Sequence, residues 1–421
     1  MKQLNLLLAV ICLVLAGEVK SQNWVVYNTT NSNIPDNTVK CIAIDNQGNK
    51  WLGTEKGLAK FDGNTWTTYD TLNSDLPCNT VTSLAIDRDG NKWIGTYQYD
   101  STYNIKAALA KFDGSNWTVY DTSNSKLRNR AIKEIAIDSS GHKWFGYTYG
   151  LLKLEDTSWT VYNTSNTPLL ADGVLEITVD KDGKKWISVG NYGWFSTRHG
   201  ALAIYDDTTW TVYDYQNPQL GTRFVNSIAF DDAGNQWMGG YGFAKFGDAG
   251  WTRYDTINYE VLTVAVDDLS NKWLGLYNSV GPAMAKFDGI NWNFFDKSNS
   301  GLPTNSVYQI IVDKYNNKWL ATSGGLVAYN ENGVFVKGNK QTENIFTVYP
   351  NPTTGSFQIK CLTAGSVGSK VEVYDMSGKM LLSRKYDNDS PTINIENLTP
   401  GIYFVKLTAK GQTAVRKVVK L

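Results

Sequence analysis

The residues best suited to chemistry lie in a few segments that interrupt an otherwise regular sequence pattern. They combine aromatic rings with amide, carboxylate or guanidinium groups, a set that suits a sugar ring or the surface of a partner protein. We therefore expect a ligand-binding surface made of Tyr97, Tyr99, Asp100, Tyr103, Tyr147, Tyr149, Asn191, Tyr192, Trp194, Phe195, Arg198, His199, Tyr277 and Asn278. In the competing interpretation, these aromatic side chains fold back and pack against neighbouring loops.

Evidence for catalysis or metal binding is weaker. The sequence holds only two histidines, and Cys41, Cys78 and Cys361 lack the spacing of metal ligands, so we expect neither a metal nor a cofactor. A glycosidase needs two carboxylates that converge on one pocket. No spacing selects a pair among Glu55, Asp100, Glu134 and Glu176. We favour a protein that is not an enzyme, with a polysaccharide hydrolase or lyase and a purely structural protein as the alternatives.

Four arginines could bind an anionic group if the fold brings them to one face. They are Arg128, Arg130, Arg198 and Arg223. The same four residues can equally be separate, solvated charges, and the sequence leaves both interpretations open.

A repeat accounts for most of the chain. One tryptophan follows an Asp-x-x-Gly-Asn-like turn at Trp51, Trp93, Trp144, Trp186, Trp237, Trp273 and Trp319. Another opens a Trp-Thr-x-Tyr-like segment at Trp24, Trp66, Trp117, Trp159, Trp210, Trp251 and Trp292. A residue that recurs seven times indicates packing, and we expect Asp45, Asp87 and Asp138 to cap the turns through backbone N–H groups. Only Trp194 falls outside the register.

Each repeat contains four short strands, typified by "CIAID", "KWLGT", "GLAKFDG" and "WTVYD". Four strands recurring at about 40 to 50 residues predict a seven-bladed β-propeller. The nearly continuous apolar first strand predicts burial on both faces. The segment 24–27 precedes any complete repeat, so we expect it to complete the last blade in preference to 333–337.

The repeats differ in the loop between the second and third strands. From the turn tryptophan to the aromatic residue of the third strand there are nineteen residues in repeats two and four and fourteen in repeat six, against nine or ten elsewhere. Alternating strand direction places these loops on one face, together with the loops that lead into each first strand. We expect the ligand site there.

The chain ends outside the repeat are different in kind. Residues 1–21 have a lysine, an apolar run and small residues, which predict a signal peptide. We expect the propeller at 22–336, a linker at 337–345 and a second domain at 346–421. Short alternating strands in the last segment predict a small immunoglobulin-like β-sandwich. Forty basic residues balance forty acidic ones, which argues against nucleic acid, and no later apolar run predicts a membrane span. The scattered cysteines indicate free thiols, with a Cys41–Cys78 disulfide as the alternative.

Two family resemblances agree with this division. Residues 24–335 resemble the two-component regulator propeller repeat, on segments such as "NTVTSLAIDRDGNKWIGT" and "GLAKFDGNTWTTYD". Residues 346–421 resemble the C-terminal sorting domain of type IX (Por) secretion, on "YPNP" at 349–352, "GSF" at 355–357, "YDMSGK" at 374–379 and "LTPGIYFVKL" at 398–407. The second resemblance implies a partner, the type IX secretion machinery of a Bacteroidetes-type bacterium, and a secreted or outer-membrane-surface location.

Overall fold

The computed structural model describes residues 23–190, 200–214, 224–278, 281–331, 346–361, 369–375, 380–386, 390–409 and 412–421. The chain divides into two compact units between Val336 and Lys337. The described residues form strands and connecting loops and contain no helix.

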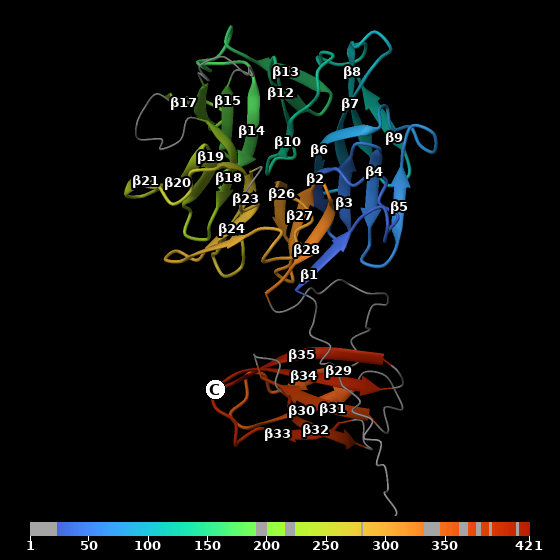
Figure 1. The fold of residues 1–421 in the computed structure, drawn as a ribbon, viewed down its shortest axis with the longest axis vertical. Helices are drawn as coiled ribbons and strands as arrows, with labels where there is room; N and C mark the ends of the chain where they lie inside the picture. The colour runs from blue at the N-terminus through green and yellow to red at the C-terminus, as the bar shows by residue number, and fades with distance from the viewer. Residues whose placement is uncertain are drawn as a thin grey trace, which may run out of the picture. The chain divides into compact units, whose positions relative to one another are not determined.

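The described part of the first unit forms seven antiparallel sheets of four strands each (Figure 1). Blades 1 and 2 contain β2 (Val39–Ile44), β3 (Lys50–Thr54), β4 (Gly57–Phe61), β5 (Trp66–Tyr69), and β6 (Thr80–Ile86), β7 (Lys92–Tyr99), β8 (Ile105–Phe112), β9 (Trp117–Tyr120). Blades 3 and 4 contain β10 (Glu134–Ile137), β11 (Lys143–Tyr147), β12 (Gly150–Glu155), β13 (Ser158–Tyr162), and β14 (Val174–Val179), β15 (Lys185–Gly190), β16 (Gly200–Tyr205), β17 (Trp210–Asp214). Blades 5 and 6 contain β18 (Val225–Phe230), β19 (Gln236–Gly240), β20 (Gly242–Gly247), β21 (Gly250–Tyr254), and β22 (Glu260–Val266), β23 (Lys272–Tyr277), β24 (Met284–Phe287), β25 (Trp292–Phe295).

The seventh blade joins the two ends of the propeller. It consists of β26 (Val307–Val312), β27 (Lys318–Thr322), β28 (Gly325–Tyr329) and, from the start of the described chain, β1 (Trp24–Tyr27). Trp24 pairs with Tyr329 and Tyr27 with Leu326, so the predicted closure by 24–27 is confirmed. The first strands contact one another around a closed ring and lie nearest its centre, with the fourth strands outside (Figure 1).

The repeated tryptophans hold the turns and the blades together. In all seven blades the turn aspartate accepts a hydrogen bond from the indole nitrogen of the second-strand tryptophan, at 2.7 to 3.0 Å. The same carboxylates accept backbone N–H groups of their turns, as in Asp45 with Asn49 at 2.9 Å, which confirms the predicted capping role. A lysine from the next blade lies over the tryptophan ring, for example Lys50 over Trp319 at 4.3 Å.

Close approach between blades explains the glycine of the second strands. A Cβ atom added to Gly53 would lie 2.6 Å from Cγ1 of Val81 in the next blade and 2.4 Å from Sγ of Cys41. Any larger side chain would push the two blades apart, so the "KWLGT" pattern records an inter-blade contact.

The second unit contains seven described strands in two sheets. One sheet has the order β29 (Phe346–Tyr349), β30 (Ser356–Cys361), β33 (Thr392–Asn394); the other has the order β32 (Met380–Tyr386), β31 (Ser369–Tyr374), β34 (Gly401–Ala409), β35 (Gln412–Lys420). Phe346, Phe357, Val371 and Val405 form its core.

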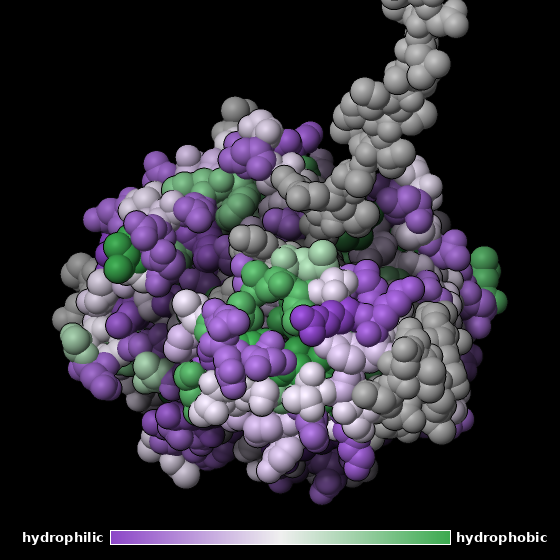
Figure 2. All heavy atoms as spheres, turned by 90° about the horizontal axis from the view of Figure 1, so that it is seen from below, coloured by the Kyte–Doolittle hydropathy of each residue, from purple (hydrophilic) through white to green (hydrophobic). Residues whose placement is uncertain are grey.

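On the face of the molecule drawn in Figure 2, polar residues predominate and apolar residues gather in a few patches.

Candidate ligand-binding face

One face of the propeller carries the loops between second and third strands together with the loops that lead into the first strands; we call it the loop face. The two kinds of loop touch each other directly. Tyr241 forms an isolated bridge with Glu260, and Tyr277 forms one with Ser306. The opposite face carries the Asp-containing turns between first and second strands, such as 45–49.

In blade 2 the lengthened loop is a hairpin that extends β7 and β8 beyond the neighbouring blades. Tyr97 and Tyr99 meet edge to face with ring centroids 5.8 Å apart. Tyr99 is 59% exposed and Tyr103, at the tip, is 87% exposed. This hairpin therefore presents aromatic surface to solvent, as predicted for the loop face.

Asp100 has a structural partner set within the same hairpin. Its carboxylate accepts hydrogen bonds from the backbone N–H groups of Thr102 and Asn104, at 2.8 and 2.9 Å, and from the Thr102 hydroxyl at 2.7 Å. The hydroxyl and backbone bonds lower the pKa of Asp100. Asp100 therefore shapes the turn, and its carboxylate has little remaining capacity to act as a general acid.

In blade 3 the two predicted tyrosines have different environments. Tyr147 is only 1% exposed and packs in the core beside Trp93 and Leu127, so the expectation that it offers a ligand-binding surface is corrected. Tyr149 is exposed, and the guanidinium carbons of Arg128 and Arg130 lie 5.3 and 5.5 Å from its ring centroid. The structure thus brings together two of the four predicted arginines.

The other predicted residues are distributed as follows. Tyr277 of blade 6 is 58% exposed on the loop face. Tyr241 of blade 5 is similarly exposed there and was missed, because its loop is short; the signal was the tyrosine between glycines in "GGYGF". Outside the described residues lie Asn191, Tyr192, Trp194, Phe195, Arg198, His199 and Arg223.

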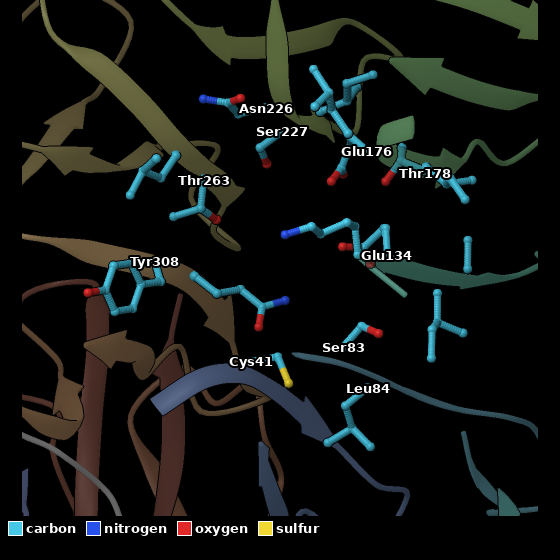
Figure 3. A pocket seen from close by; sticks show the side chains of 18 of the residues that line it. Cys41, Ser83, Leu84, Glu134, Glu176, Thr178, Asn226, Ser227, Thr263 and Tyr308 are labelled. Carbon is cyan, nitrogen blue, oxygen red and sulfur yellow. The ribbon is translucent and has the colours of Figure 1, made fainter. Parts of the chain in front are cut away.

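The first strands enclose a cavity of about 490 Å³ at the centre of the propeller (Figure 3). Consecutive first-strand residues, which point to opposite faces of the strand, are both buried in Ser83 with Leu84 and in Thr263 with Val264, so the predicted burial on both faces is confirmed there. One equivalent position per blade forms a ring of mostly polar side chains: Cys41, Ser83, Glu134, Glu176, Ser227, Thr263 and Gln309. This ring could not be recognised in the sequence, because its polar residues occur singly within the apolar runs of the first strands.

Several ring members bind the backbone of the next blade. Ser227 Oγ accepts from the N–H of Val264 at 3.0 Å, and Gln309 Oε1 accepts from the N–H of Ile42 at 2.6 Å. The Glu176 carboxylate accepts in the same way from the N–H of Ile228. This ring position therefore joins adjacent blades, whatever else it does.

Glu134 and Glu176 bring two carboxyl groups together in the cavity. Figure 3 shows both side chains directed inward from neighbouring blades. Burial raises the pKa of Glu134 to about 7, and burial followed by repulsion from Glu134 raises the pKa of Glu176. Near neutral pH the pair therefore retains protons that exposed glutamates would have lost.

Of the remaining charged groups near the cavity, the candidate carboxylate Glu55 is paired with Lys40, and burial affects the cavity-lining Lys133. Glu55 lies 2.9 Å from the ammonium of Lys40 and accepts from the Thr80 hydroxyl at 3.2 Å, which removes it from the carboxylate pair. Burial, with the neighbouring charge of Lys40, lowers the pKa of Lys133.

The cysteines and His142 have structural environments. Cys41 and Cys78 are buried free thiols, so the disulfide alternative is wrong. Burial raises the pKa of Cys41 to about 12, which disfavours the nucleophilic thiolate. The Nδ1 atom of His142 lies 3.0 Å from Asp138 in a turn on the opposite face. Within the described ranges, no cluster of three or more His, Cys, Asp or Glu residues could hold a metal, and no helix could cross a membrane.

Two family models match parts of the chain. The secretion system C-terminal sorting domain matches residues 347–421, and the two component regulator propeller matches residues 75–98. A search of curated proteins gives no match. The chain therefore combines a β-propeller with a type IX sorting domain, and its location is secreted, cell-surface or extracellular.

Solved structures support the fold. PorZ, an essential bacterial surface component of the type IX secretion system of Porphyromonas gingivalis, matches with a TM-score of 0.56 and 16% identity, over 94% of this chain and 60% of the PorZ chain. A streptogramin B lyase matches with a TM-score of 0.54 and 15% identity, over 74% of this chain and 99% of the lyase. A catalytically inactive histidine-to-alanine variant of virginiamycin B lyase from Staphylococcus aureus, with quinupristin, matches with a TM-score of 0.54 and 14% identity, over 72% and 98% of the two chains. The present chain thus spans about 60% of the length of PorZ.

Proposed function

We propose that the propeller is a non-enzymatic binding module that recognises glycans outside the cell through its loop face. One observation carries the proposal: the second-strand tryptophans of the repeat are buried, whereas four tyrosines that depart from the repeat are exposed on the loop face. Tyr99, Tyr103, Tyr241 and Tyr277 are each more than half exposed.

Exposed tyrosines suit a sugar ligand for physical reasons. A tyrosine ring offers a flat apolar surface to the C–H groups of a sugar, and its hydroxyl supplies a hydrogen-bonding group at the edge. Tyrosine also has few rotatable bonds, so little side-chain entropy is lost on binding. The secreted location supported by the sorting domain makes surface and environmental glycans accessible.

A second candidate function is a propeller-based polysaccharide hydrolase, and the Glu134–Glu176 pair favours it. Two carboxyl groups with raised pKa values in one cavity resemble the acid partner of a glycosidase. We rank it second because Glu176 has the same inter-blade hydrogen-bonding role as Ser227 and Gln309, which are not acids. For the lyase alternative, His142 offers no support, because it is bound to Asp138 on the other face.

A binding screen with matched variants tests the proposal. The full chain is screened against a glycan library, beside Tyr99→Ala, Tyr277→Ala and the control Tyr315→Ala. Tyr315 is 45% exposed but lies in a turn on the opposite face. We expect saturable binding that weakens in at least one loop-face variant and is unchanged in the control.

Two results would contradict the proposal. One is the absence of any glycan binding by the full chain; the other is binding that Tyr315→Ala weakens as much as the loop-face variants. Release of reducing sugar from bound glycans, lost in Glu176→Gln, would instead establish the hydrolase.

A further inference from the structure

The loop that leads into blade 3 departs from the loops at the same position in other blades. In blades 1, 2, 3, 4 and 7 a buried apolar residue stands five positions before a buried valine or isoleucine at or near the start of the first strand: Ile34, Leu76, Leu127, Leu169 and Leu302. Three positions after it, blades 1, 2 and 4 have Asn37, Asn79 and Asp172. Blade 3 has Arg130 there, and Arg128 stands where blades 1, 2 and 7 have proline.

The residue that Arg130 replaces has a clear structural role. Asn37, Asn79 and Asp172 each accept a hydrogen bond from the backbone N–H of the threonine eight residues earlier, at 2.8, 2.9 and 2.8 Å. The corresponding threonine in blade 3 is Thr122. A guanidinium group has no acceptor atom, so Arg130 cannot make this bond. Loss of a stabilising contact that three other blades make is the pattern expected of a functional position.

Arg128 and Arg130 both lie near the ring of Tyr149. Both guanidinium groups lie within 5.5 Å of its ring centroid. Arg130 Nη1 donates to the carbonyl of Asn129 at 2.8 Å. Within the described part of the chain, neither arginine has a carboxylate within salt-bridge distance. Asp172 and Arg128 both act electrostatically on Tyr147, and Asp172 already accepts a hydrogen bond from the backbone N–H of Thr164.

Two positive charges held on one ring, with no carboxylate among the described residues at salt-bridge distance, make a site for an anion. Guanidinium donors match the two oxygens of a carboxylate, and the ring fixes the arginines without neutralising them. Since its ring carries the arginines, Tyr149 acts here as a positioning residue, in place of the sugar-stacking role expected from the sequence.

The exposed tyrosines of blade 2 lie on the adjacent blade. The hydroxyl of Thr82 donates to the carbonyls of Gly95 and Ile132, at 3.2 and 2.7 Å, which ties β7 to the end of the arginine-bearing loop. Aromatic surface and a cationic site therefore belong to neighbouring blades. This combination favours an acidic sugar over an acidic peptide, which needs no aromatic stacking partner.

We propose that Arg128 and Arg130, positioned by Tyr149, bind the carboxylate of an acidic sugar unit in the glycan that the loop face recognises. This inference rests on the proposed function and specifies its ligand class. Each arginine contributes charge-assisted hydrogen bonds to the carboxylate, and the adjoining hairpin of blade 2 contacts the rest of the glycan.

The test uses a variant that restores the repeat. Arg130→Asn supplies the acceptor for Thr122 that blades 1 and 2 have, so it should fold at least as well as the parent. Binding of trigalacturonate and of sialyllactose is measured for the full chain by calorimetry, with galactotriose and lactose as their uncharged counterparts. Arg88→Ala, an exposed arginine in a turn on the opposite face, is the matched control.

We expect at least one acidic sugar to bind more tightly than its uncharged counterpart. In Arg130→Asn that binding should weaken by about 10-fold to 100-fold, the range for charge-assisted hydrogen bonds. Its dependence on salt should also decrease, and Arg88→Ala should behave like the parent.

Other outcomes separate the two proposals. If charged and uncharged sugars bind equally and Arg130→Asn changes neither, the acidic-sugar site is wrong and the glycan-binding function stands. If hexa-aspartate competes as well as the acidic sugars, the ligand is a peptide and the inference is wrong. If no sugar binds the parent, both proposals are wrong.

Discussion

Replacing Glu134 by glutamine should change how the stability of the propeller depends on pH. In the folded state burial holds the pKa of Glu134 at about 7, against 4.5 for an exposed glutamate. The cavity around it also holds Glu176, Cys41 and Lys133. Between these two pH values the folded state keeps a proton that the unfolded state has lost, so the free energy of unfolding falls as pH rises. Glutamine carries no titrating group and removes this loss.

The size of the effect follows from the pKa difference. A change from 4.5 to about 7 corresponds to about 3 kcal/mol. Water in the cavity screens the carboxylate and reduces this figure, so we expect the glutamine variant to gain about 1 to 3 kcal/mol above pH 7.5. The two proteins should be equally stable below pH 4.5, where the carboxyl group is protonated in both states. The gain corresponds to a rise in Tm of about 2 to 6 °C.

Tryptophan fluorescence of the full chain gives the required measurement. All fifteen tryptophans lie between Trp24 and Trp319, so the signal reports unfolding of the propeller alone. Unfolding is followed from pH 4 to 8.5 for the parent, Glu134→Gln and the control Asp89→Asn, an exposed carboxylate on the opposite face. A glutamine variant that is destabilised at every pH, or that differs from the parent equally at pH 4.5 and pH 8, would refute the assignment of a neutral, buried Glu134.

Three further predictions concern the repeat and the sorting domain. Asp267→Ala should destabilise the propeller by about 3 to 5 kcal/mol, because it leaves the buried ammonium of Lys318, which is 3.1 Å away and 1% exposed, without its carboxylate partner. Denaturant unfolding measures this loss of stability, and a loss below 1 kcal/mol would contradict the prediction. Gln236→Lys should raise stability by about 0.5 to 1 kcal/mol. In other blades the lysine at this position lies over the second-strand tryptophan of the preceding blade, which for blade 5 is Trp186. A lower Tm of the variant would contradict a stabilising contact between the lysine and Trp186. Deletion of residues 346–421 should abolish appearance outside the cell, as cell fractionation reports, and undiminished export would show that the sorting domain is dispensable.

The propeller was predictable because its signals recur. The turn aspartate and the second-strand tryptophan meet a local packing requirement that is repeated in every blade, and the inter-blade glycine meets one that recurs in five of the seven blades. Seven copies made the four-strand unit recognisable, and the unmatched "WVVY" at 24–27 predicted the closure that β1 and β28 form.

The candidate site was predictable only in part, because burial at the end of a strand or within a loop leaves no periodic signal. Tyr147 and Tyr149 look alike in the sequence, yet one packs against Leu127 and the other carries two arginines. The pairing of Glu134 with Glu176 could not be selected from spacing, because neighbouring blades bring together residues far apart in the chain. A comparison of equivalent positions between blades does distinguish Arg130, because blades 1 and 2 have asparagine there. The structural meaning of this difference requires the hydrogen bonds that those asparagines accept.

Hydrogen exchange of the full chain, with and without bound glycan, shows which surface of the propeller recognises the ligand. We expect saturating glycan to slow amide exchange in the loop-face segments 96–106, 128–132 and 148–150, and to leave exchange in the turns at 45–49 and 313–317 unchanged. Protection confined to those turns, or to the second unit, would show that the loop face is not the recognition surface.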